Sequence, residues 1–184
     1  MRRSLRPWLA LCGALILGRP EPARAKVYLS REEAAHLVFG EQARLIEERR
    51  ALTPEARAVA QARLGRPVYD EAFLVLVAQG PSGVEGYGLV MEEMGKHEPI
   101  TFFVAISPDG RVKDVLVLEY RESRGGEVRQ KGFLRQYLGK TSADPLRLEQ
   151  DITPITGATI SARALSDGVK KALVIWETLY RAPS

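Results

Sequence analysis

The sequence predicts an α+β domain in which an antiparallel sheet meander is flanked by helices. Four apolar, strand-like stretches follow one another at 72–79, 84–93, 99–107 and 112–120 without a helical pattern between them. The last two are separated by "PDG", a turn sequence that joins antiparallel strands. Helical patterns are confined to the two ends of the chain, which is typical of α+β rather than of alternating strand–helix architecture.

One globular unit is the expected organisation, because 184 residues suit a single domain. Residues 26–70 are expected to form a helical, charged N-terminal segment that belongs to the same unit as 71–184. Ser30 and Glu33 have the spacing of a capping box before a helix over about 31–38. The stretch "EQARLIEERRAL" continues this polar, amphipathic character after that helix.

A second helix is predicted from "TPE" at 53–55, which places an N-cap threonine, a proline at the first helical position and an early acid in order. Gly65 is its expected end. Beyond the sheet, 122–132 is interpreted as a polar loop and 133–139 as a short helix that ends at its glycine. Residues 140–151 are expected to form an extended connection.

The last helix is predicted over about 161–180, because apolar residues recur there at steps of three and four. They form one face, which consists of Leu165, Val169, Ala172, Leu173, Trp176 and Tyr180. In 112–120, by contrast, the apolar residues do not alternate strictly. Both faces of that strand are therefore expected to be partly covered.

Residues 1–25 are typical of a secretory signal peptide. Three arginines precede the 12-residue apolar run "PWLALCGALILG", and Ala23 and Ala25 give the small-x-small cleavage pattern. The run is shorter than the ~20 residues that a membrane-spanning helix needs. We therefore expect a protein of the periplasm or of the extracytoplasmic face of the membrane, with an uncleaved membrane anchor as the alternative.

Removal of this signal changes the charge of the chain. Basic residues fall from 27 to 22 and acidic residues from 23 to 22, so the net charge falls from +4 to 0. A general nucleic-acid partner then lacks its electrostatic basis. The remaining chain has no cysteine, which excludes disulfides, a thiolate nucleophile and cysteine-held iron–sulfur clusters. His36 and His97 are its only histidines, and no metal site is expected.

The candidate functional motif is the tetrapeptide Thr156-Gly157-Ala158-Thr159, which opens the last helix. In a purely structural interpretation, Thr156 or Thr159 caps the helix and Gly157 supplies an unusual backbone torsion. Ser161 is a further candidate cap. In a chemical interpretation, the free N–H groups and positive dipole end of the helix attract a phosphate, to which a threonine hydroxyl is esterified.

This motif and the following "ARALSDGVKKAL" resemble the FMN-binding domain family, which includes the extracytoplasmic FMN-carrying subunits of Rnf-type complexes and of sodium-translocating NADH:quinone reductases. The resemblance implies that FMN is attached through its phosphate to Thr159 by a dedicated flavin transferase with FAD as donor. Thr156, Gly157 and Ala158 match the other three positions of the family motif. Ile160, Ser161 and Glu122 are further candidates for the cofactor site. "FFVAISPDGRVKDVLVLEYRES" and "FLRQYLGK" extend the resemblance weakly over the domain.

Two departures from the family pattern are visible. Members commonly carry an acid three positions before the first Ser/Thr of the tetrapeptide, where this chain has Thr153; Asp151 lies two residues earlier. Family subunits also usually retain a membrane helix, which a cleavable signal replaces here. A stand-alone carrier is therefore favoured over a subunit of either complex.

Residues outside the tetrapeptide are further candidates for the flavin site. Glu122, Arg124 and the glycines at 125–126 either face the flavin or form a solvated charged turn. Lys96 and His97 are candidates for the same edge. Tyr87 and Phe102 are expected either to stack on a ring or, as strand aromatics more often do, to lie in the core.

The function predicted from these observations is that of an exported, membrane-associated flavoprotein with covalent FMN. It is expected to carry electrons between a membrane reductase and an extracytoplasmic or membrane acceptor. No catalytic triad is present in the sequence pattern, and Thr159 is a nucleophile only during its own modification. The alternatives are a flavin-free binding module of the same fold and a flavin oxidoreductase that acts on its own small substrate.

Overall fold

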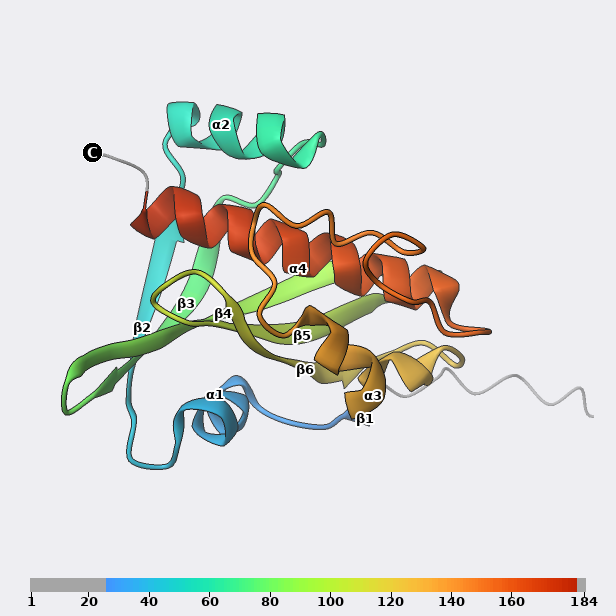
Figure 1. Ribbon diagram of the computed structural model, residues 1–184, viewed down its shortest axis with the longest axis horizontal. Helices are drawn as coiled ribbons and strands as arrows, with labels where there is room; N and C mark the ends of the chain where they lie inside the picture. Colours follow the sequence, from blue (N-terminus) through green and yellow to red (C-terminus); the bar gives the residue numbers. More distant parts are fainter. Residues whose placement is uncertain (1–25, 182–184) are drawn as a thin grey trace, which may run out of the picture.

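A computed structural model describes residues 26–181, so the predicted signal peptide lies outside the described residues. A six-stranded antiparallel sheet has the strand order β1-β6-β5-β4-β3-β2. Helix α4 lies along one face of the sheet with α2 packed on it, and α1 covers the opposite face (Figure 1). The predicted α+β class is therefore confirmed.

The elements follow one another in a simple order, with two 3-10 helices (η1 and η2) around the short helix α3. They are β1 Lys26–Val27, α1 Arg31–Phe39, β2 Arg44–Ala51, α2 Pro54–Leu64, β3 Ala72–Gly80, β4 Gly83–Met94, β5 Pro99–Ile106, β6 Val112–Tyr120, η1 Gly126–Arg129, α3 Lys131–Leu134, η2 Arg135–Tyr137 and α4 Thr159–Tyr180.

The predicted meander corresponds to β3, β4, β5 and β6, each of which pairs with the next in antiparallel register. Two register shifts occur between β5 and β6, one of them between Thr101 and Phe102. At that shift the pairing passes from Glu119 to Val117 and omits Leu118. Such a β-bulge adds one residue to the strand and so interrupts the regular alternation of its side chains between the two faces of the sheet. This explains the imperfect alternation of apolar residues in β6.

Both N-terminal helices begin where their caps predict. Ser30 Oγ accepts a hydrogen bond from the Glu33 N–H at 3.1 Å, and the Glu33 carboxylate accepts one from the Ser30 N–H at 2.6 Å. Helix α2 starts after Thr53, whose Oγ1 accepts from the Ala56 N–H at 3.2 Å. It ends at Gly65, which has a positive φ of 66°.

The helical expectation for the stretch between these two helices is wrong. Residues 44–51 form β2, which pairs with β3 along its whole length and is an edge strand of the sheet. Its side chains are mostly charged and exposed, and charged side chains are common on edge strands because they discourage further pairing. The charge pattern of residues 44–51 is also typical of a surface helix. Backbone hydrogen bonds to β3 make this stretch a strand instead.

Helix α4 supplies much of the core on its face of the sheet. It starts at Thr159, two residues before the predicted start, and its predicted apolar face packs on β4 and β5. Gly168 makes this close approach possible, because a Cβ there would lie 2.2 Å from the Phe102 ring. Phe102 is fully buried and therefore belongs to the core. Within residues 26–181, no helix is long and apolar enough to span a membrane.

Candidate cofactor site

Helix α4 begins without a side-chain cap, so the predicted capping roles of Thr156, Thr159 and Ser161 are wrong. Ala158 is the N-cap residue, and its own N–H donates to the Ile155 carbonyl at 3.0 Å. The N–H groups of residues 159–161 have no hydrogen-bond acceptor in the part of the chain that the structure describes. Three donors at the positive end of a 22-residue helix therefore remain available to an anion.

The tetrapeptide presents these donors to solvent. Gly157 has a φ of 81°, and no atom lies within 4 Å of the position that a Cβ would occupy. The glycine therefore serves the backbone torsion, as predicted, and leaves open space in front of the helix. Ala158 is buried, whereas the side chain of Thr159 is exposed and has no hydrogen-bond partner among the described residues. Its hydroxyl is therefore not engaged by the described part of the chain.

Ser161 joins the first turn of α4 to the loop that follows β6. It is 5% exposed, and its Oγ lies 2.9 Å from the hydroxyl oxygen of Tyr120. The Tyr120 hydroxyl donates its single proton to the Arg124 carbonyl at 2.5 Å, so Ser161 acts as the donor to Tyr120. Burial raises the pKa of Tyr120 despite this hydrogen bond from Ser161.

Gly125 allows this junction to form. It has a φ of 84°, and a Cβ there would lie 2.8 Å from both Ser161 Oγ and the Tyr120 hydroxyl. Both the torsion and the space therefore require glycine. The loop after β6 is held against the start of α4 by contacts that only glycine at this position permits.

Glu122 holds the turn between β4 and β5 in place. Its Oε1 accepts hydrogen bonds from the N–H groups of His97 at 2.6 Å and Glu98 at 3.1 Å. Burial alone would raise the pKa of Glu122, but the backbone N–H groups of this turn outweigh burial and lower it. The carboxylate therefore remains ionised at neutral pH and fixes Lys96 and His97 opposite the start of α4.

A cleft of about 610 Å³ lies between these three segments. It is lined by Lys96, His97, Glu122, Ser123, Arg124, Gly125, Gly157, Ala158, Thr159, Ile160 and Ser161. Its volume is within the range of small-molecule sites. The sequence candidates in the β4–β5 turn and in the loop after β6 are thus brought together with the tetrapeptide, although they are far apart along the chain.

Not every candidate reaches this cleft. Thr156 and Gly126 are absent from its lining. Tyr87 lies at the other end of α4, where its ring centroid is 5.5 Å from that of Trp176 and 4.5 Å from that of Tyr180. Ser123 was missed by the sequence reasoning, because a serine in a polar loop carries no distinguishing signal.

The lining combines charge with apolar surface. Lys96 and Arg124 form no ion pair within residues 26–181, whereas Ile160 presents an apolar side chain that is 51% exposed. The cleft can therefore accept a ligand with an anionic end at the helix and an uncharged, flat body beside it. The residues present fit a nucleotide-like cofactor with one phosphate.

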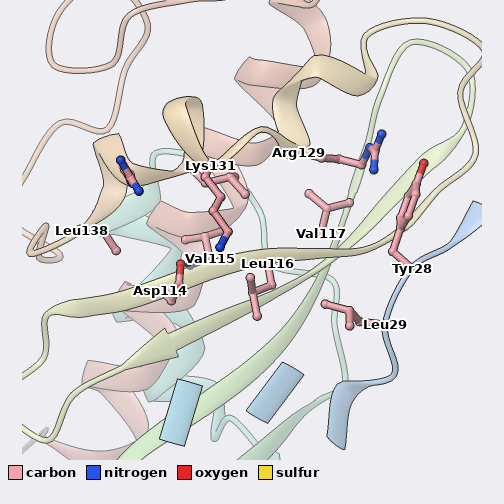
Figure 2. A pocket seen from close by; sticks show the side chains of 11 residues that line it. Tyr28, Leu29, Asp114, Val115, Leu116, Val117, Arg129, Lys131 and Leu138 are labelled. Atoms are coloured by element: carbon pink, nitrogen blue, oxygen red, sulfur yellow. Dashed lines mark hydrogen bonds between the residues drawn. The ribbon is translucent and has the colours of Figure 1, made fainter. Parts of the chain in front are cut away.

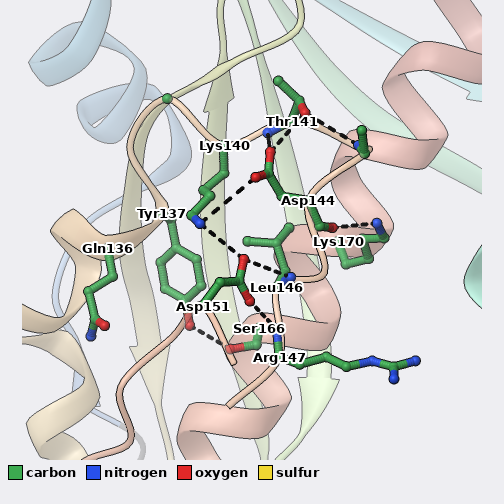
Figure 3. Close-up of polar contacts among 12 residues, drawn as sticks. Gln136, Tyr137, Lys140, Thr141, Asp144, Leu146, Arg147, Asp151, Ser166 and Lys170 are labelled. Atoms are coloured by element: carbon green, nitrogen blue, oxygen red, sulfur yellow. Dashed lines mark hydrogen bonds and ion pairs between the residues drawn. The ribbon is translucent and has the colours of Figure 1, made fainter. Parts of the chain in front are cut away.

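The chain that approaches the tetrapeptide is fixed by Asp151 (Figure 3). Its carboxylate accepts hydrogen bonds from Lys140 Nζ at 3.0 Å and from the N–H groups of Leu146 at 3.1 Å and Arg147 at 2.8 Å. Burial would raise the pKa of Asp151, but these donors outweigh it and lower the pKa. This acid therefore organises the connection before α4 and does not line the cleft.

Thr153, at the position where the family commonly has an acid, is held through its backbone. The Gln136 side chain accepts from the Thr153 N–H at 2.7 Å and donates to the Thr153 carbonyl at 3.2 Å. The threonine side chain itself is exposed. Substitution at this position would therefore leave the approach to the tetrapeptide intact.

The fold and the cleft define a small α+β domain that offers a helix N-terminus and a free hydroxyl to an anionic ligand. Residues 95–174 match the family model of the FMN-binding domain. The matched range contains every residue that lines the cleft. The resemblance that the tetrapeptide indicated is therefore confirmed over these residues.

Similar proteins agree with this match. Over 103 residues the chain is 32% identical to the G component of the proton-translocating ferredoxin:NAD(+) oxidoreductase complex of Clostridium ljungdahlii, an alignment that covers 52% of this chain and 56% of the relative. The chain therefore spans little more than half the length of this curated relative.

Solved structures share the fold. A component of the Na(+)-translocating NADH-quinone reductase from Parabacteroides distasonis superposes with a TM-score of 0.56 at 13% identity, covering 86% of this chain and 87% of its own. NqrC from Shewanella oneidensis gives a TM-score of 0.53 at 16% identity, covering 78% and 85%. At these identities the likeness establishes the α+β fold alone.

Proposed function

We propose that this protein carries FMN in the cleft, attached through its phosphate to Thr159, and transfers electrons between a membrane reductase and an extracytoplasmic or membrane acceptor. One observation carries the proposal: the Thr159 hydroxyl is exposed at the uncapped start of α4, inside a cleft that lies within the matched range. A structural capping residue would instead have its hydroxyl engaged with the helix backbone.

The residues of the cleft have distinct roles in this proposal. Thr159 Oγ1 is the nucleophile in a single maturation step that a flavin transferase catalyses. Its bond to the FMN phosphorus of FAD forms as the pyrophosphate bond breaks, AMP leaves and the hydroxyl proton is released. The N–H groups of residues 159–161 then stabilise the phosphodiester charge, with Lys96 and Arg124 in the same lining.

Bound FMN would supply one- and two-electron exchange, and the protein would supply position and electrostatics. Ser161 and Tyr120 hold the loop after β6, while Glu122 holds the β4–β5 turn. Ile160 adds apolar surface beside the attachment point. A covalent tether suits an exported protein, because FMN that is lost outside the cytoplasm is not readily replaced.

The proposed export of the protein and its proposed redox partner are supported by two different observations. The pattern of residues 1–25 favours export, and the similarity to a component of a ferredoxin:NAD(+) oxidoreductase complex favours a membrane redox partner. Cleavage of a signal with this pattern would suit a carrier that moves between partners. A dedicated flavin transferase is required for maturation.

Mass spectrometry of the exported protein tests the chemistry directly. The chain is coexpressed with a flavin transferase of the family and digested with trypsin, which cleaves after Arg147 and Arg163. We expect an FMN adduct on peptide 148–163, assigned to Thr159 by fragment ions that separate it from Thr153 and Thr156. An unmodified peptide from a protein without flavin absorbance would overturn the proposal and favour a flavin-free binding module.

Kinetics of the isolated flavoprotein separate a carrier from an enzyme with its own substrate. A carrier is reduced once per FMN by a chemical or protein donor and then stops. Steady turnover of a small substrate without a protein electron donor would contradict the carrier role. This result would leave the attachment at Thr159 standing.

A further inference from the structure

The outer edge of β6 is paired only at its two ends. At one end, the Tyr28 N–H donates to the Leu118 carbonyl at 2.8 Å, next to the short strand β1. At the other end, the Val112 N–H donates to the Lys140 carbonyl, and the Val112 carbonyl accepts from the Gly139 N–H, both at 2.8 Å. Between them, residues 113–117 have no neighbouring strand on this side in the described chain.

A groove of about 330 Å³ lies along this open stretch (Figure 2). Leu29 and Leu116, which are both partly buried against the core on the α1 side of the sheet, form its apolar wall there. Val115 and Val117 point to the opposite side (Figure 2). On that side Leu134 of α3 and Leu138, which follows η2, also line the groove. The groove therefore runs between two apolar walls along a stretch of β6 that has no strand partner on its outer side among the described residues.

Positive charge gathers on the α3 and η2 side of the groove. Arg129, Lys131 and Arg135 line it, and none of them forms an ion pair within the described residues. The guanidinium of Arg129 lies 4.0 Å from the centre of the Tyr28 ring. The acid in the lining, Asp114, accepts a hydrogen bond from the Val115 N–H at 2.8 Å. The groove consequently favours an anionic occupant.

The opposite edge of the sheet is built differently. Strand β2 exposes most of its side chains, with Arg and Glu residues along its length. Such an edge is protected by charge against further pairing. The β6 edge instead has a recessed gap with apolar walls, in which a short partner strand would be sheltered from water.

We propose that this gap, the β6 groove, binds a short extended segment of a protein partner in which acidic and apolar residues alternate. The segment would add to the β6 edge, because successive side chains of a strand point to opposite faces. Its acidic side chains would face Lys131 and Arg135, and its apolar ones would face Leu29 and Leu116. With a rise of ~3.3 Å per residue, four or five residues span the open stretch.

The occupant is a partner rather than the chain's own first segment. Residues 1–25 carry five arginines and one glutamate, so their charge has the wrong sign for this groove. The β6 groove shares no lining residue with the cleft at Thr159. A partner can therefore dock here while the cleft is occupied, and the inference does not depend on the cofactor.

Fluorescence anisotropy of the purified full chain with a labelled Glu-Val-Glu-Val-Glu peptide tests the proposal. We expect saturable binding, weakened at least about tenfold in the double variant Lys131→Glu/Arg135→Glu, since each cation contacts a carboxylate in the complex. The matched control is Arg44→Glu/Arg49→Glu on the β2 edge, which makes the same charge change on exposed residues. It should bind the peptide as the unaltered protein does.

Two further probes separate pairing from simple charge attraction. A peptide with backbone N-methyl groups on its strand-pairing face should bind at least about tenfold more weakly, as should Lys-Val-Lys-Val-Lys. Urea midpoints of both double variants, expected to match that of the unaltered protein, exclude unfolding as the cause. The proposal is overturned if the peptide does not bind, or if the two double variants lose the same affinity for it. It is also overturned if N-methylation of the peptide does not weaken binding.

The same variants identify other occupants of the β6 groove. Sedimentation that shows a dimer lost only in Lys131→Glu/Arg135→Glu would assign the groove to a second copy of the chain. Binding to phosphatidylglycerol vesicles that is lost in the same variant, without peptide binding, would assign it to a membrane surface. Either result would replace the peptide proposal.

Discussion

The hydroxyl oxygens of Tyr120 and Ser161 lie 2.9 Å apart, and this contact joins the end of the meander to the first turn of α4. Both residues are buried, and they are separated by 41 positions in the sequence. Through the Arg124 carbonyl the same contact positions the loop after β6. The shape of the cleft around Thr159 therefore depends on this pair of buried hydroxyl groups.

Tyr120→Phe is expected to lower the free energy of unfolding by about 1–3 kcal/mol, because it leaves the buried Ser161 hydroxyl without its partner and removes the partly buried hydrogen bond to the Arg124 carbonyl. The fraction of protein that carries FMN after coexpression should fall as well. Urea denaturation and absorbance of the purified protein measure the two effects.

Tyr137→Phe is the matched control for this change. It removes the 2.9 Å hydrogen bond between Tyr137 and Ser166, away from the cleft, and should reduce stability without reducing flavin content. Equal loss of flavin in both variants would mean that general stability, rather than the position of the loop after β6, limits modification.

Gly125→Ala is expected to destabilise the protein more than Gly139→Ala. Both glycines have a positive φ, but only at position 125 would the added Cβ meet other atoms, 2.8 Å away. The backbone strain of a non-glycine residue at positive φ is common to both variants and cancels in the comparison. Gly125→Ala should therefore lower the free energy of unfolding by at least about 1 kcal/mol more than Gly139→Ala, which is the lower end for overpacking. Equal costs by chemical denaturation would show that the loop after β6 can move away from Ser161.

Thr159→Ala is expected to abolish the covalent FMN adduct, whereas Thr156→Ala should retain it. The two threonines are both exposed, so neither change should alter stability by more than about 0.5 kcal/mol. Intact-mass measurement after coexpression with the transferase reads the adduct. An FMN adduct on the Thr159→Ala protein would show that FMN is attached to another residue. Loss of the adduct from the Thr156→Ala protein alone would assign the attachment to Thr156.

Asp151→Asn is expected to cost about 1.5–3 kcal/mol at neutral pH, since the carboxylate accepts from Lys140 and two backbone N–H groups. The folded state lowers the pKa of Asp151, so its contribution is fully present above the unfolded value of about 4. That contribution is lost as the pH falls through the lower, folded pKa.

The difference in unfolding free energy between the unaltered protein and Asp151→Asn should therefore be constant from about pH 6 to 8 and shrink below about pH 4. Acids that do not interact with Asp151 titrate equally in both proteins and cancel, whereas Asp144, whose pKa the charge of Asp151 raises, adds a smaller change in the same acidic range. Urea titrations across this range measure the difference. A difference that is independent of pH down to pH 3 would show that charge at Asp151 contributes nothing.

Much of the fold was predictable from local sequence. The four meander strands and the caps at Ser30 and Thr53 were recognised because each signal lies within a few residues of the structure that it controls. The tetrapeptide and the helix after it were recognised for the same reason. The stretch 44–51 was not, because its charged residues fit the surface of a helix as well as the edge of a sheet.

The cleft itself was only partly predictable. Its candidate residues were named from three separate stretches, but nothing local indicated that Ser161 binds Tyr120 instead of capping its helix.

Local propensity was sufficient where short-range hydrogen bonds and apolar periodicity select the conformation. Tertiary structure alone decided the pairing of β2 with β3, the uncapped start of α4 and the meeting of the β4–β5 turn with Thr159. The physical reason is that these features depend on backbone hydrogen bonds and buried contacts between residues tens of positions apart. Their partners become available only when the sheet has formed and α4 has packed on it.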